Sequence, residues 1–131
     1  MAIEFGLEEA SNIFLINVSK KLGIEELIHA QGKCESTIKA VGNIKILIVL
    51  SDFQGWEKAQ GWEDISFAEK NDAYIDKIAI VGDKERWEDL IHAFTTKGLR
   101  PVPIEFFGET EISAARGWLV DGDKDKDATK Y

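Results

Sequence analysis

The sequence predicts an α/β fold with a five-stranded, mostly parallel sheet and four helices. Residues 44–50 are apolar except for Lys45, and a short run rich in Ile and Val is typical of a central strand buried on both faces. Strands and single helices then alternate along the chain, which favours right-handed crossovers between parallel strands. The first two strands follow each other closely, and this short connection predicts one antiparallel strand at the N-terminal edge.

The N-terminal part of the chain supplies the edge pair, the first helix and the central strand. Glu25 and Glu26 favour a helix start, because acidic side chains stabilise the free N–H groups of a first turn. Gly42 follows the last apolar position and is a typical C-terminal stop. The predicted elements are strands at 3–6, 13–18 and 44–50 and a helix at 24–41.

The rest of the chain continues the alternation. The predicted helix 56–71 has a weak apolar stripe, so we expect it to be the least firmly held helix. Helix 84–97 has apolar residues at ideal helical spacing, and Asp83 is a candidate N-cap. Two prolines mark the strand 101–107 as an edge strand. A strand at 74–81 and a last helix from residue 110 to about residue 120 complete the pattern.

Composition and charge exclude several classes of protein. The net charge of −8 disfavours nucleic acid as a partner, because such binding depends on neutralising phosphates. No signal peptide and no apolar run of about 20 residues is visible, and the single Cys34 suits a reducing compartment. We therefore expect a cytoplasmic protein with one domain at 1–120 and a disordered, charged tail at 121–131.

The end of the central strand is the candidate binding site, since sites in open α/β sheets gather where strands give way to helices. Trp56 and Trp62 flank the start of the weak helix and could border an apolar pocket, although aromatic side chains more often pack in a core. The candidate ligand-binding residues are Ser51, Asp52, Phe53, Gln54, Trp56, Trp62, Ile65 and Phe67.

Residues 51–56 are predicted to form a turn between the central strand and the weak helix, and carboxylates gather around it, at Asp52, Glu57, Glu63 and Asp64. They could hold Mg²⁺ or serve as acid and base. Helix-end hydrogen bonding and solvation is the favoured alternative, because no nucleophile or basic partner accompanies them. We expect no catalytic residue, no metal site and no cofactor, since the sequence has no histidine pair and no glycine-rich phosphate loop.

Three short segments carry a family resemblance. Residues 50–56 (LSDFQGW), 62–64 (WED) and 78–83 (IAIVGD) resemble the SpoIIAA-like family of bacterial proteins, a branch of the STAS superfamily of anti-sigma-factor antagonists and transporter tails. The resemblance covers about residues 2–120 and implies a superhelix of βα units. Signalling members carry a phosphoserine in an Asp-Ser-Gly turn, whereas this chain has Ser51 before Asp52, so we expect no regulatory phosphorylation there.

The residues and the resemblance together suggest a non-enzymatic bacterial binding module. The family's similarity to lipid-carrier folds implies a small apolar or lipid-like ligand, which would lie under a mobile helix 56–71. Opening of that helix would allow transient membrane contact through Trp62, Ile65 and Phe67. The alternatives are a protein-interaction regulator of the anti-sigma-factor-antagonist kind and, at lower weight, an enzyme using Asp52 and Glu63. A homodimer is compatible with each of these hypotheses.

Overall fold

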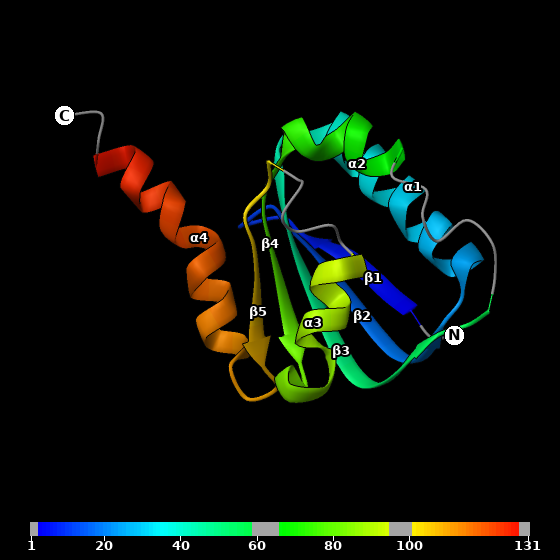
Figure 1. The fold of residues 1–131 in the computed structure, drawn as a ribbon. Helices are drawn as coiled ribbons and strands as arrows, with labels where there is room; N and C mark the ends of the chain where they lie inside the picture. Colours follow the sequence, from blue (N-terminus) through cyan, green and yellow to red (C-terminus); the bar gives the residue numbers. More distant parts are fainter. Residues whose placement is uncertain (1–2, 59–65, 95–100, 129–131) are drawn as a thin grey trace.

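The computed structural model describes residues 3–58, 66–94 and 101–128, and the side chains of these residues except 90, 93–94 and 122–128. In this part of the chain the strands form a five-stranded sheet in the order β1-β2-β3-β4-β5, with helices on both faces (Figure 1). Strand β1 is antiparallel to β2 and the other neighbours are parallel, which confirms the predicted fold class. The elements in chain order are β1 (Ile3–Glu8), β2 (Ile13–Leu22), α1 (Ile24–Val41), β3 (Ile44–Trp56), α2 (Ser66–Asn71), a 3₁₀ turn (Asp72–Tyr74), β4 (Ile75–Gly82), α3 (Lys84–Phe94), β5 (Ile104–Gly108) and α4 (Ile112–Ala128).

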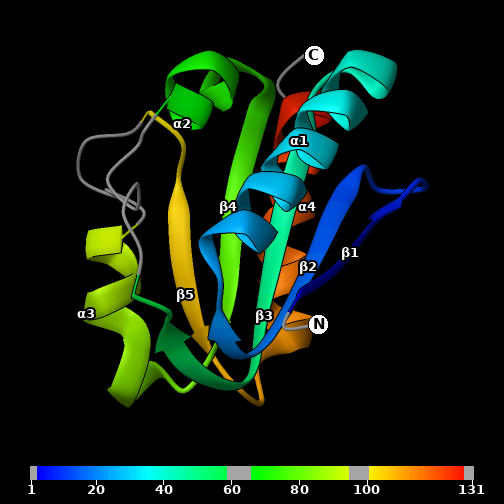
Figure 2. The ribbon, with the colours of Figure 1, turned by 90° about the vertical axis from the view of Figure 1, so that its right-hand side faces the viewer.

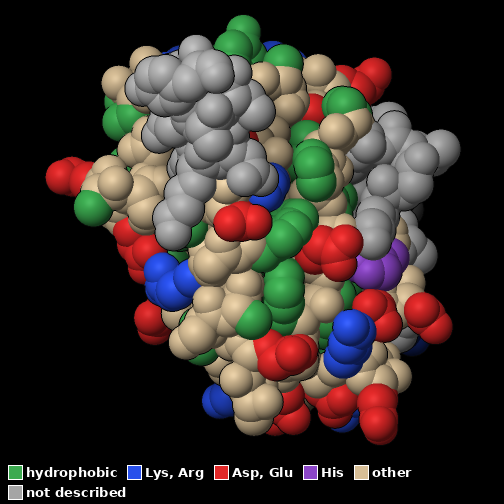
Figure 3. Space-filling model, turned by 90° about the vertical axis from the view of Figure 1, so that its left-hand side faces the viewer, with side chains coloured by type: hydrophobic (Ala, Val, Ile, Leu, Met, Phe, Trp, Pro, Cys, Tyr) green, Lys and Arg blue, Asp and Glu red, His purple; other side chains and the backbone are tan. Residues whose placement is uncertain are grey.

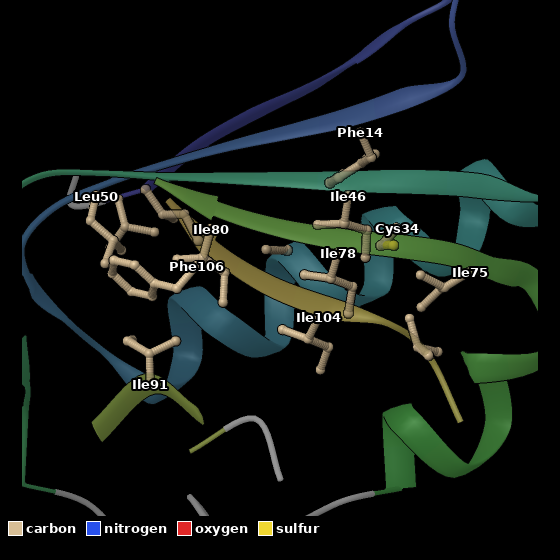
Figure 4. Packing of buried hydrophobic residues seen from close by; sticks show 14 of the residues in the cluster. Phe14, Cys34, Ile46, Leu50, Ile75, Ile78, Ile80, Ile91, Ile104 and Phe106 are labelled. Carbon is tan, nitrogen blue, oxygen red and sulfur yellow. The ribbon is translucent and has the colours of Figure 1, made fainter. Parts of the chain in front are cut away.

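The larger core lies between the sheet and the helices α1 and α3. Ile46, Ile78 and Ile104 are cross-strand neighbours on β3, β4 and β5, and Ile80 and Phe106 are neighbours in the next row toward the carboxyl ends. Figure 4 shows these rows between the sheet and the helices. The buried helical side chains packed against them are Ala30, Cys34 and Ile38 of α1 and Trp87 and Ile91 of α3.

The opposite face of the sheet is covered, among the described helices, by α4 (Figure 1). Leu47, Ala115 and Leu119 are completely buried there, so the central strand is buried on both faces as predicted. Lys77 fastens α4 to β4, because its Nζ donates a 2.7 Å hydrogen bond to the Trp118 carbonyl and lies 4.8 Å from the centre of the Trp118 ring. Figure 3 shows this side of the molecule, where an apolar strip is bordered by acidic side chains.

An ion pair connects the edge strand β1 to α4. Two guanidinium nitrogens of Arg116 donate hydrogen bonds of 2.5 and 2.8 Å to the two carboxylate oxygens of Glu8. This hydrogen bonding, assisted by the positive charge, lowers the pKa of Glu8 below its usual value of 4.5. The pair joins residues far apart in the sequence and anchors the start of the β1–β2 hairpin connection.

The structure corrects the predicted helix 56–71. Strand β3 continues through Trp56, and a helix is present only at α2, Ser66–Asn71, within the described part of this segment. Residues 51–56 remain extended because they pair with the end of β2, and because Phe53 and Gly55 are buried while Asp52 and Gln54 are exposed. This alternation with a period of two is the pattern of a strand and not of a helix.

Helix α4 extends beyond residue 120, where the predicted domain ends. Helix α4 runs on to Ala128, whereas the sequence predicts disorder from Asp121; residues 129–131 lie outside the described part. The division between a domain at 1–120 and a tail at 121–131 therefore remains a prediction. None of the described helices is long and apolar enough to cross a membrane.

Candidate functional site

The candidate site lies at the carboxyl ends of β3, β4 and β5, on the end of the sheet that the sequence indicates. Beyond Ser51 the pairing of β3 with β2 shifts register, and Lys20 and Asp52 adopt positive φ angles of 56° and 54°. Gly55 follows with φ 100°, a conformation that suits glycine. These irregularities bend the end of β3 away from β4 and toward α3, as Figure 2 shows.

An aromatic cluster fixes this bent segment on α3. The Phe53 ring lies 4.8 Å from the Trp87 ring and 5.3 Å from the Trp56 ring, both in edge-on geometry, and the two tryptophan rings are 6.0 Å apart. Such edge-on pairs are favourable beyond the area that they bury. A Cβ at Gly55 would lie 3.6 Å from Trp87, so the strand passes close to α3 at this point.

A small polar pocket opens beside the aromatic cluster. It has a volume of about 160 Å³ and is lined by Leu50, Asp52, Phe53, Asp83, Arg86, Trp87 and Glu109. The Asp83 carboxylate accepts a 3.3 Å hydrogen bond from the Arg86 backbone N–H, which places Asp83 at the N-terminus of α3 as predicted. The guanidinium of Arg86 lies 4.9 Å from the centre of the Trp87 ring, a cation–π arrangement.

The exposed polar residues that line the pocket, with the exposed chain neighbours of Asp52 and Phe53, are called the carboxyl-edge surface: Ser51, Asp52, Gln54, Asp83, Arg86 and Glu109. Three carboxylates and a single guanidinium line the pocket, so the surface is locally acidic. Pockets that bury small ligands usually measure about 300–1,000 Å³ and are mostly apolar. The geometry therefore suits ion pairs and hydrogen bonds with a partner surface better than burial of an apolar ligand.

The enzyme hypothesis and possible metal binding both concern acidic side chains near the end of β3. No three His, Cys, Asp or Glu side chains described by the structure converge in a way that could hold a metal ion. Asp52, the carboxylate on which the enzyme hypothesis depends, is exposed, and Glu63 lies outside the described residues.

The predicted site residues separate into three groups. Ser51, Asp52 and Gln54 are exposed on the carboxyl-edge surface, as a binding role requires. Phe53 is only 5 % exposed and belongs to the core, and Trp56 and Phe67 are half-buried against it. Trp62 and Ile65 lie outside the described residues, so their predicted contact with a ligand remains a prediction.

The described part of the proposed lid, α2, is fastened to α1. Asn71 is 4 % exposed, and its side-chain amide donates a 3.1 Å hydrogen bond to the Glu35 carboxylate. Lys70 lies 3.8 Å from the same carboxylate. The Asn71 hydrogen bond, with help from Lys70, lowers the pKa of Glu35 below its usual value. These contacts restrict movement of the C-terminal end of α2.

Sequence reasoning missed Arg86 and Glu109 as site residues. The rule that directed attention to the end of β3 applies equally to the ends of β4 and β5, where Gly82 precedes Asp83 and Gly108 precedes Glu109. The available signal was therefore the repeated Gly-acid pair after consecutive parallel strands.

Comparisons with known proteins agree with this architecture. The model of the SpoIIAA-like family matches residues 13–120. Among solved structures, an uncharacterized protein with a SpoIIAA-like fold from Shewanella loihica PV-4 is similar over 90% of this chain and 92% of that chain, with 21% identity and a TM-score of 0.62, which shows a shared fold. The comparison with curated proteins gives no significant match. Because the family model spans most of the chain, including the whole candidate site, this protein belongs to the SpoIIAA-like family of the STAS superfamily.

Proposed function

We propose that this protein is a non-enzymatic regulatory interaction module that binds a partner protein through the carboxyl-edge surface. Membership of the SpoIIAA-like family supports a regulatory or interaction role in general terms. The observation that carries the specific proposal is the pocket beside Trp87, a small, open and polar hollow with an aromatic floor. A hollow of this size accepts one side chain of a partner.

The charge of the surface determines the kind of partner. Asp52, Asp83 and Glu109 exceed the single Arg86, so a partner surface with Lys or Arg side chains is complementary. Arg86 stacked on Trp87 is the expected energetic centre, because Trp and Arg are enriched among the residues that dominate binding energy at interfaces. The bent end of β3 presents Asp52 and Gln54 as rim contacts around that centre.

The proposal is tested by site-specific photo-crosslinking in cells that express the protein, with a photoreactive amino acid in place of Gln54. A matched control carries the same residue at Ser36, which is exposed on α1. We expect a protein adduct from position 54 that is missing from position 36. Calorimetry with the identified partner should then give a five- to thirtyfold weaker affinity for Arg86→Ala, which removes the expected energetic centre, and a smaller loss for the rim variant Asp52→Asn. Glu69→Gln, an exposed change on α2, should leave the affinity unchanged.

The rival ligand-binding hypothesis predicts different results. An apolar ligand would be bordered by residues 59–65, outside the described part, and by the half-buried Trp56 and Phe67. Native mass spectrometry of the purified protein would then show a retained lipid-like molecule, and position 54 would give no protein adduct. That pair of results would replace the interaction proposal with the ligand hypothesis.

A further inference from the structure

The two edges of the sheet are built differently. Strand β5 follows Pro101 and Pro103, which lack the N–H groups that an added strand would need. Strand β1 contains no proline, pairs with β2 in an unbroken register over Ile3–Glu8 and, within the described residues, has no other strand beside it. In Figure 2, β1 forms the margin of the sheet and no other described element lies beyond it. The β1 edge is therefore accessible to a further strand.

Gly6 in the middle of β1 has no explanation within one copy of the chain. Its φ angle is not positive, and a Cβ at this position would meet nothing within 4 Å. Glycine in a strand interior destabilises the strand by about 0.5–1 kcal/mol relative to alanine. Such a glycine often marks a place where another backbone approaches closely.

We propose that β1 pairs antiparallel with β1 of a second copy, in a symmetric dimer centred on Phe5. A two-fold axis perpendicular to the sheet keeps the faces of the two copies aligned, so directly opposed residues must come from the same face of β1. Ile3, Phe5 and Leu7 share one face, and Glu4, Gly6 and Glu8 share the other. Only registers centred on a residue satisfy this condition.

Charge then selects one register among those that centre on the middle of the strand. Centring on Glu4 opposes the two Glu4 carboxylates directly, and centring on Gly6 opposes Glu4 to Glu8. Centring on Phe5 opposes Ile3 to Leu7 and Glu4 to Gly6, so apolar pairs with apolar and no carboxylates are directly opposed. Because Gly6 has no side chain, the Glu4 carboxylate of the partner strand faces neither a like nor an opposite charge in this register.

The register predicts that a positive and a negative side chain at position 6 change the dimer affinity in opposite directions. Gly6→Lys places an ammonium opposite each Glu4 of the other copy and should tighten the dimer about three- to tenfold, whereas Gly6→Glu should weaken it by a similar factor. Both side chains enter open space in one copy, so the fold should persist. The measurement is sedimentation equilibrium of the full chain over a range of protein and salt concentrations.

Gly32 on α1 provides the control, because it is also exposed and a Cβ added there would meet nothing within 4 Å. Gly32→Lys and Gly32→Glu change the net charge by the same amounts as the two Gly6 variants. The dimer affinities of the two Gly32 variants should therefore not differ in the way expected at Gly6. A protein that stays monomeric at concentrations up to about 1 mM overturns the proposal. So does a dimer that Gly6→Lys and Gly6→Glu leave unchanged or shift in the same direction.

Discussion

The two parts of β3 lie in contrasting surroundings. Residues 44–50 pair with β2 in an unbroken register and with β4 on the other side, and are packed between helices on both faces. Residues 51–56 pair with β2 alone, through a shifted register, and alternate between buried and exposed. The first part stabilises the domain, and the second presents polar side chains at the edge of the sheet. One strand thus supplies both rigidity and a recognition surface, because its partner on one side ends earlier.

The largest test of this contrast removes a side chain from the first part. Leu47 is 0 % exposed and packs against Leu119 of α4. Leu47→Ala should lower the free energy of unfolding by about 3 kcal/mol, since the loss combines hydrophobic transfer with an unfilled cavity. Urea denaturation followed by tryptophan fluorescence measures it. A loss smaller than that caused by Trp56→Ala would mean that residues 44–50 are not the main source of stability.

The second test acts on the aromatic cluster of the bent part. Trp56 is half-buried and packs edge-on against Phe53 and Trp87. Trp56→Ala should lower the free energy of unfolding by about 1–2 kcal/mol, because only part of its apolar surface is withdrawn from water. Hydrogen exchange should accelerate in residues 51–56 and remain slow in residues 44–50. Equal acceleration in both parts would show that β3 opens as one unit.

The same contrast explains what the sequence could predict. Residues 44–50 have a local, two-sided apolar pattern, and this pattern predicts the central strand that is buried on both faces. The extension of the strand through residues 51–56 depends on pairing with the end of β2, which a local sequence pattern does not reveal. Gly55, with its positive φ angle, is a residue type that normally indicates a turn. Arg86 and Glu109 meet Asp52 only because the sheet order brings three strand ends together. The fold is therefore predictable from local periodicity, and the site largely is not.

A third test uses a substitution of Asp52 that should increase stability and weaken partner binding. Its φ of 54° is a region that residues other than glycine adopt at a cost, although aspartate tolerates it better than most. Asp52→Gly should raise the free energy of unfolding by about 0.5–1 kcal/mol while weakening partner binding through loss of the carboxylate. Asp52→Ala is the matched control and should lower stability, because alanine keeps the backbone strain without the polar side chain. If glycine and alanine change stability in the same direction, backbone strain is not what limits this position.

The smallest expected effect concerns pH and involves the ion pair of Glu8 with Arg116, which is level with the start of β3 and separated from it by β2. Hydrogen bonding from Arg116 lowers the pKa of Glu8 below 4.5 in the folded protein. A carboxylate with a lowered pKa adds stability above its unfolded pKa, and that contribution disappears as the pH falls through the folded pKa. The side chains are 35 % and 38 % exposed, so solvent screening limits the contribution to about 0.5 kcal/mol.

Comparison with Glu8→Gln isolates this contribution. At neutral pH the wild-type protein should be more stable than the variant by that amount, and the difference should vanish as the pH is lowered below 4.5 through the folded pKa. Urea denaturation of both proteins at several pH values measures the difference directly. Because Glu8 lies far along the sheet from the carboxyl-edge surface, partner binding by Glu8→Gln should equal that of the wild type at neutral pH. A pH-independent difference would show that Glu8 acts through packing and not through its charge, and weakened partner binding would show that the two ends of the sheet are coupled.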